Sequence, residues 1–168
     1  MPQVPHNVQV TETLVLEVSR VLIGLALAVW IGGTFVIAVT AAKLFGALPS
    51  RAQAGDLFGQ ILHALDRAKF VAAGAALVGI LLEVQVAGST LPQRHVVRAV
   101  VLFLLIASHV FAVMVVQPKM RYYREKIGDL DSAAEDDPWR RKFQREHRRS
   151  SRANVFGLVL ALVALMIG

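Results

Sequence analysis

The hydrophobic pattern of the chain consists of four long apolar stretches that are almost free of charge. Residues 21–42, 99–117 and 153–168 hold 22, 19 and 16 residues without Asp, Glu, Lys or Arg, and residues 70–93 are interrupted by Glu83 alone. Because the hydrocarbon core of a bilayer is about 30 Å thick, a helix crosses it with about 20 residues. The pattern predicts an all-α integral membrane four-helix bundle. Its single domain covers residues 1–168, with spans expected near 14–42, 68–88, 97–117 and 150–168.

The connection between the first two expected spans has an amphipathic pattern. Ser50 fits as the N-cap of a helix over residues 51–67. Apolar side chains recur on one face of this segment and polar side chains on the other, which predicts an amphipathic helix lying at the membrane interface before the second span. His63 with Asp56 and Asp66 could bind a metal there, but a solvated polar face is the simpler interpretation.

The connection between the last two spans carries signals for helix boundaries. The third span should continue past Pro118, where proline kinks the helix at the membrane interface without breaking it. Gly128 predicts the end of this helix. Asp137 followed by Pro138 predicts the N-cap and the first residue of the last helix.

The basic residues of the chain are distributed unequally between the two sides of the expected bundle. The net charge is +6, and 15 of the 18 Lys and Arg residues fall in the two long connections. Only Arg20, Arg94 and Arg98 remain for the other side. The positive-inside rule then predicts an inner (plasma) membrane protein with cytoplasmic connections and both termini outside. Since the charge follows the spans, it does not indicate a nucleic-acid partner.

His109 is the sharpest candidate for chemistry within the spans. It lies 11 residues from Arg98, hence about 16 Å into the membrane and near the depth of Trp30. A neutral imidazole can ligate haem iron or copper, but the positions sharing its helix face are aliphatic. A hydrogen bond to a neighbouring helix is the simpler role. The chain has no cysteine for thiolate metal sites, so we expect no cofactor, with haem b at His109 as the alternative.

Glu83 is the acidic residue of the second span. Pairing with Arg94 or Arg98 would make it structural. A proton or cation path would need further acidic residues within the spans, and the pattern offers none. Small-solute or ion transport therefore ranks below the other functions.

The last helix carries a stripe of polar and small residues at helical spacing. Intervals of 4, 3, 4, 3 and 4 residues place the members within a band about 80° wide. Such a band suits close packing with hydrogen bonds to another helix. The six residues of this predicted packing stripe are Phe143, His147, Ser150, Asn154, Gly157 and Ala161.

The arginines of the same helix that lie outside the stripe are candidates for contact with lipid. Each basic side chain near an anionic surface contributes about 1 kcal/mol of attraction. The sequence therefore predicts anionic lipid headgroups as partners of Arg141, Arg145, Arg148, Arg149 and Arg152.

The first span combines a tryptophan with closely spaced small residues. Gly24, Ala28 and Gly32 recur every four residues, a spacing that lets another helix approach closely. Tryptophan prefers the membrane interface, so a Trp30 at the midplane should face protein. Trp30, Gly32 and Gly33 are therefore expected to take part in helix packing.

Several of these motifs together carry a resemblance to a known family. Trp30-Ile31-Gly32-Gly33, Leu44-Phe45, Pro118, and the Phe143, His147, Ser150 and Asn154 pattern resemble the transmembrane protein 205-like family of small four-span proteins of unknown function. That family is similar in layout to the copper-resistance D membrane domain, whose relatives carry a histidine ahead of the Trp-x-Gly motif. Residues 21–29 contain no histidine, so the resemblance does not carry over haem or copper chemistry. It implies fold and membrane residence and leaves the activity open.

These observations favour a non-enzymatic role. We expect a structural or accessory multi-pass membrane protein that packs with itself, as a homo-oligomer, or into a larger membrane complex. A haem- or metal-binding redox protein that uses His109 is the main alternative, and a transporter is the third.

Overall fold

The computed structural model describes residues 6–88, 92–128 and 131–168. The described part of the chain contains helices and no strand, which confirms the all-α prediction. Four helical segments are long and apolar enough to cross a membrane, as expected for a multi-pass membrane protein. The elements are α1 (His6–Ala47), α2 (Arg51–Ala87), α3 (Gln93–Phe111), the π-helical turn η1 (Ala112–Val116), α4 (Gln117–Ile127) and α5 (Pro138–Ile167).

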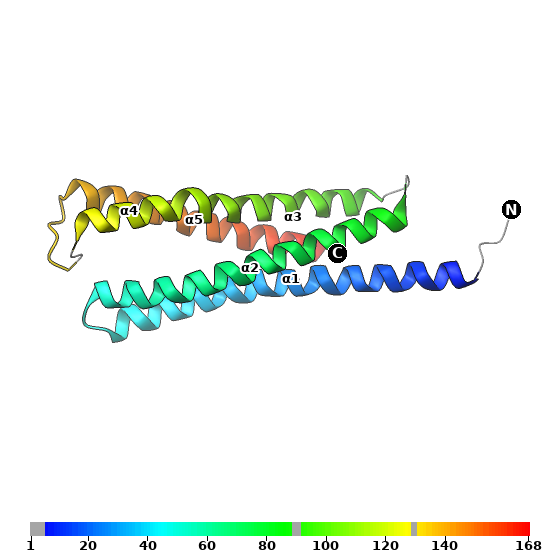
Figure 1. Cartoon of the computed structure of the whole chain (residues 1–168), viewed down its shortest axis with the longest axis horizontal. Coiled ribbons are helices and arrows are strands. Elements are labelled where there is room, and N and C mark those ends of the chain that lie inside the picture. The colour runs from blue at the N-terminus through cyan, green and yellow to red at the C-terminus, as the bar shows by residue number, and fades with distance from the viewer. Residues whose placement is uncertain (1–5, 89–91, 129–130) are drawn as a thin grey trace.

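The helices form two antiparallel pairs that pack into one elongated bundle (Figure 1). α1 lies along α2, while α3, η1 and α4 follow one another as a continuous rod beside α5. α5 also contacts α1 and so joins the two pairs. The apolar core lies where they meet and is formed by Ile23, Ala26, Leu27, Trp30, Ala72, Ala73, Ala76, Leu102, Leu105, Leu160, Ala161 and Ala164.

The amphipathic segment expected at the membrane interface is the first part of α2. Ser50 caps it as predicted, since its side chain accepts a hydrogen bond from Gln53 N. No proline interrupts residues 51–87, so the helix continues without a break into the second span. The segment is therefore held alongside α1 and does not form a separate helix on the membrane surface.

The kink expected at Pro118 takes the form of a π-helical turn that precedes the proline. Proline lacks an N–H and its ring clashes with the carbonyl four residues earlier. The five-residue turn η1 lies directly before Gln117 and Pro118, and Gln117 N bonds to Ala112 O. This wider turn makes room for the ring and lets the rod continue as α4. Gly128, with φ of 72°, then ends α4 as predicted.

The N-cap of the last helix is also confirmed. The Asp137 side chain accepts hydrogen bonds from the backbone N–H groups of Trp139 and Arg140, and Pro138 is the first helical residue. Two of the unpaired donors at the helix start are satisfied in this way.

Candidate functional site

A cluster of polar side chains is buried between α2 and the α3–α4 rod. We call Asp66, Lys69, His109 and Gln117 the core cluster. Asp66, Lys69 and His109 are only 5%, 2% and 7% exposed. Asp66 and Lys69 share a face of α2 because residues three apart are neighbours on a helix. Ionisable groups this deep in a membrane bundle are costly to bury and commonly mark functional sites.

The π-helical turn brings Gln117 to the same side of the rod as His109. On an uninterrupted α-helix, a residue eight positions after His109 would lie about 80° around the axis from it. The turn η1 accommodates one extra residue, so Gln117 takes the angular position of a seventh residue, within about 20° of His109. The turn η1 therefore brings Gln117 into the core cluster.

Asp66 is the centre of the core cluster. Gln117 Nε2 donates a hydrogen bond to Asp66 Oδ2 over 2.6 Å. His109 Nε2 lies 4.0 Å from Asp66 Oδ1, beyond hydrogen-bond distance. Among the described residues, His109 Nε2 is buried without a hydrogen-bond partner. The imidazole interacts with the backbone of Asp66 on α2, so the hydrogen bond expected to a neighbouring helix stays a prediction.

Two aromatic rings hold the imidazole in place. The centroid of Trp30 lies 6.1 Å from that of His109, with the rings nearly perpendicular at 84°. The Phe70 centroid lies 5.0 Å away. Edge contacts of this kind favour one ring orientation. Trp30 is 2% exposed and belongs to the apolar core.

Lys69 supplies a buried positive charge close to Asp66 along α2. Within the described part of the chain, no carboxylate lies within 4.0 Å of its ammonium group. A carboxylate, an imidazole and an ammonium group, drawn from two helices, thus share one water-poor region. Such a set can hold a proton and pass it between oxygen and nitrogen.

Haem does not fit at His109 in this structure. An axial ligand needs open space in front of its nitrogen for the iron and the macrocycle. His109 Nε2 is enclosed instead, with Asp66 in front of it and the rings of Trp30 and Phe70 beside the imidazole. The core cluster therefore gives no support to a haem protein.

The metal site considered around His63 is not assembled. His63 is exposed, Asp56 binds Arg124 at 2.8 Å, and Asp66 points into the core cluster. Across residues 6–88, 92–128 and 131–168, no three metal-binding side chains come together. The polar face of this segment is partly used to hold α4, through Arg124.

A second buried group of polar side chains lies at the end of the bundle where α2 connects to α3. Glu83, 5% exposed, pairs with Arg98, which confirms one of the two pairings expected for it. His95 Nδ1 lies 2.9 Å from Glu83 Oε2. Ser19 Oγ lies 3.1 Å from Glu83 Oε1 and 2.9 Å from Gly79 O, so its proton is shared between them. We call Ser19, Glu83, His95 and Arg98 the end cluster.

Members of the predicted packing stripe on α5 differ in their surroundings. Ser150, Gly157 and Ala161 are buried, Phe143 and Asn154 are half-buried, and His147 is exposed. A Cβ on Gly157 would lie 3.5 Å from Leu105, so α5 approaches α3 closely there. His147 stacks on Phe143 with ring centroids 6.3 Å apart.

Glu146 is a buried residue of α5 that the sequence pattern did not single out. It is 2% exposed and accepts a hydrogen bond from Arg149 at 2.8 Å, while Arg145 lies 3.8 Å away. The five arginines predicted to meet lipid are all exposed. The arginines that contact Glu146 therefore also offset a buried charge.

The packing residues expected on α1 divide between two faces. Trp30 and Gly33 are buried, and a Cβ on Gly33 would lie 2.8 Å from Leu65 of α2. Gly32 is exposed, with nothing within 4 Å of the position of an added Cβ. Gly33 thus allows α2 to approach, whereas Gly32 faces away from the bundle.

Asp66, Lys69 and Gln117 are the site residues that sequence reasoning missed. Asp66 was placed in the amphipathic segment and considered only with His63 and Asp56, and Lys69 was counted among the basic residues of the connection. The absence of proline over residues 51–87 was the available signal for a continuous helix. Gln117 could be found only by assigning an extra residue to the turn before Pro118.

Comparison with known proteins gives a family and no function. Residues 25–128 match the domain of unknown function DUF4149, and this range includes the whole core cluster together with Glu83, His95 and Arg98. No curated protein and no solved structure matches the chain. The match does not bear on the resemblance to the transmembrane protein 205-like family, which stays a prediction. Because the match covers more than half of the sequence, the chain belongs to the DUF4149 family.

Proposed function

We propose that the protein is a self-associating multi-pass membrane protein of structural or accessory type, with α1 as the contact between copies. One observation carries this proposal. Gly24, Ala28 and Gly32 are exposed on one face of α1, and nothing lies within 4 Å of an added Cβ at either glycine. We call these three residues the α1 stripe.

The α1 stripe faces away from the bundle because the opposite face of α1 is already used. Ile23, Leu27 and Trp30 point into the apolar core. At 100° per residue, the stripe is centred about 130° around the helix from these side chains. Flanking Leu25 and Phe35 are 61% and 70% exposed. The face therefore has a shallow centre between bulky apolar side chains.

A surface of this shape suits helix association in lipid. Lipid chains are as apolar as leucine, so helices gain no hydrophobic energy from meeting. Small residues at intervals of four let two backbones approach, which adds van der Waals contact along the helices. The α1 stripe meets this requirement without disturbing contacts within the chain.

Bulky substitutions in the α1 stripe test the proposal. Ala28→Leu and Gly32→Leu should convert the oligomer to a monomer on blue-native electrophoresis in mild detergent. Gly74→Leu is the matched control, because Gly74 is an exposed glycine of α2 with open space beside it. A wild-type monomer without any co-purifying subunit, or oligomers that tolerate the stripe variants, would contradict the proposal.

The proposal includes an orientation in the inner (plasma) membrane. The excess of basic residues in the two long connections supports cytoplasmic connections and external termini. The chain has no cysteine, so single reporters can be added. An impermeant maleimide should label Gln9→Cys in intact cells and Ala134→Cys only after permeabilisation. The reverse pattern would invert the topology.

A second candidate function, proton transfer through the bundle, is favoured by the core cluster. His109 Nε2, buried and without a partner in the described residues, faces the Asp66 carboxylate. Proteoliposomes containing a pH-sensitive dye would detect a proton flux, which Asp66→Asn should abolish. Asp56→Asn is the control, since Asp56 is exposed and pairs with Arg124. Wild-type liposomes as tight as empty ones would eliminate this candidate.

A further inference from the structure

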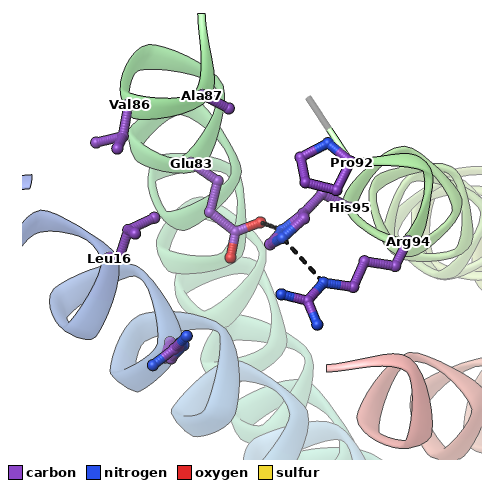
Figure 2. A pocket seen from close by; sticks show the side chains of 8 residues that line it. Leu16, Glu83, Val86, Ala87, Pro92, Arg94 and His95 are labelled. Carbon is purple, nitrogen blue, oxygen red and sulfur yellow. Dashed lines mark hydrogen bonds and ion pairs between the residues drawn. The ribbon is translucent and has the colours of Figure 1, made fainter. Parts of the chain in front are cut away.

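We infer that the cavity at the α2–α3 end of the bundle binds the phosphate group of an anionic phospholipid. The cavity has a volume of about 280 Å³ and lies between α1, the end of α2 and the first turn of α3 (Figure 2). Leu16, Val86 and Pro92 form apolar walls, while Arg20, Arg94 and His95 contribute polar groups. This inference is independent of the proposed self-association and of the arginines on α5.

The acidic group in the cavity wall is already neutralised. Glu83 is paired with Arg98, contacts His95 and accepts from Ser19, so its two oxygens are occupied. An anion entering the cavity therefore meets a compensated carboxylate rather than a free one. This is the condition that allows a negatively charged ligand to lie beside Glu83.

Two guanidinium groups keep donors free for a ligand. Arg94 Nε donates to His95 Nε2 over 3.3 Å, and among the described residues no carboxylate pairs with Arg94. Arg20 uses Nη1 for Glu17 and is 59% exposed at its side chain, so its other N–H groups face the cavity mouth or solvent. Guanidinium groups match phosphate oxygens in charge and geometry.

His95 connects this rim to the buried end cluster. Its Nδ1 lies 2.9 Å from Glu83 and its Nε2 accepts from Arg94, which Figure 2 shows as a continuous chain of contacts. A neutral imidazole satisfies both contacts by donating from Nδ1 and accepting at Nε2. The buried Glu83 thus fixes the direction of Arg94 through His95.

The three basic residues outside the long connections converge at this place. Arg20 and Arg94 line the cavity, and a smaller adjoining cavity is lined by Arg20, Arg94, His95 and Arg98 together with Ile167 and Gly168 of α5 and its C-cap. The three arginines come from two different helices, α1 and α3. α3 also begins here, and its N-cap Pro92 makes no side-chain hydrogen bond to the first turn. The positive end of the α3 dipole therefore adds to the attraction for an anion.

The depth of the cavity matches the phosphate layer of a bilayer. Trp30 and His109 contact each other near the middle of the spans. Arg20 is 10 residues from Trp30 and Arg94 is 15 residues from His109, hence about 15 Å and 22 Å from that level. The hydrocarbon core ends about 15 Å from the midplane and the headgroups extend to about 20–22 Å. A lipid phosphate is therefore the anion present at the height of the cavity.

Lipid binding by the purified full-length chain tests the inference. Native mass spectrometry in mild detergent should detect bound phosphatidylglycerol, and the Arg20→Gln/Arg94→Gln variant should lose roughly 25-fold in affinity, at about fivefold per arginine. Both side chains are exposed, so the variant should fold normally, which its circular dichroism spectrum checks. Arg51→Gln/Arg121→Gln removes the same charge from exposed sites elsewhere and should keep the affinity.

Two further ligands distinguish an anionic lipid from a free phosphate compound and from a zwitterionic lipid. Phosphatidylcholine should bind more weakly than phosphatidylglycerol, and glycerol 3-phosphate should not displace the lipid. Equal binding of both lipids, equal loss in the two double variants, or full arginine-dependent binding of glycerol 3-phosphate alone would each overturn the assignment.

Discussion

The Asp66 carboxylate links α2 to the other half of the bundle. One oxygen accepts a hydrogen bond from Gln117 at 2.6 Å, and the other faces His109 at 4.0 Å. A buried carboxylate that loses its donor remains desolvated, so this hydrogen bond matters more than one at the surface. Together with Asp56–Arg124 and Glu83–Arg98, this hydrogen bond joins α2 to the α3–α4 rod.

Replacing Gln117 should lower stability by the amount typical of a buried charged hydrogen bond. Gln117→Ala is expected to reduce the free energy of unfolding by about 1.5–3 kcal/mol, measured by titration with a denaturing detergent in mixed micelles. Gln60→Ala is the control, because Gln60 is exposed on the same bundle. Equal losses in the two variants would show that the contact with Asp66 contributes nothing.

The end cluster allows a double-mutant cycle. Arg98→Met leaves Glu83 buried without its main partner and should cost about 3–5 kcal/mol of stability. Adding Glu83→Gln removes the uncompensated charge and should restore most of this loss. The unfolding free energies of both single variants and the double variant give the coupling. Additive losses would contradict the pairing.

The sequence reveals isolated charges at span ends more readily than charges brought together by packing. Glu83 and Arg98 were predictable partners because a short connection joins their helices. Asp66 and Lys69 were not, because Asp66 was considered only with the polar side chains of the amphipathic segment and Lys69 only with the basic residues of the connection. Glu146 was hidden within a run of basic residues. Their burial follows from helix register, which depends on contacts distant in sequence.

At the scale of elements, the apolar lengths predicted which segments are helical but not where each helix bends or continues. Proline signals a distortion near residue 118, yet a kink and a π-helical turn have the same sequence signature. The choice matters here, because the extra residue in η1 places Gln117 next to Asp66. The continuity of α2 similarly places Asp66 opposite His109.

Removing the proline that follows Gln117 should therefore disturb the core cluster. Pro118→Ala restores an N–H and removes the ring, which lets an α-helical register extend through η1. Gln117 would then rotate away from Asp66, with a loss of stability similar to that of Gln117→Ala. The double variant should be no less stable than Pro118→Ala alone. Fully additive losses, in the same unfolding assay, would show that η1 does not position Gln117.

The close approach of α1 and α2 depends on Gly79. A Cβ at this position would lie 2.7 Å from an Ile23 side-chain carbon and 3.1 Å from the backbone oxygen of Ser19. Gly79→Leu should therefore separate the helices and reduce the free energy of unfolding by about 1–3 kcal/mol. The exposed Gly74→Leu should change it by less than about 0.5 kcal/mol. Similar thermal unfolding of the two variants would contradict this packing.

At the scale of the whole molecule, the ends and the middle of the bundle have surfaces of different chemical character. The basic connections and the arginines of α5 lie at one end of the bundle, and the cavity with Arg20 and Arg94 lies at the other. Between them, the α1 stripe offers a shallow apolar face. The bundle thus has polar contacts inside, charged contacts at its ends and, in the proposed oligomer, small residues at the centre of the interface.

Disulfide cross-linking of a single added cysteine tests the proposed α1 contact most directly. The chain has no cysteine, so an Ala28→Cys variant carries one thiol. Two copies packed along the α1 stripe bring their thiols within disulfide range, which requires Cα atoms roughly 4.4–6.8 Å apart. Oxidation in native membranes should give a covalent dimer of Ala28→Cys and none of Gly74→Cys. No dimer of Ala28→Cys, or equal dimer from both positions, would contradict the account.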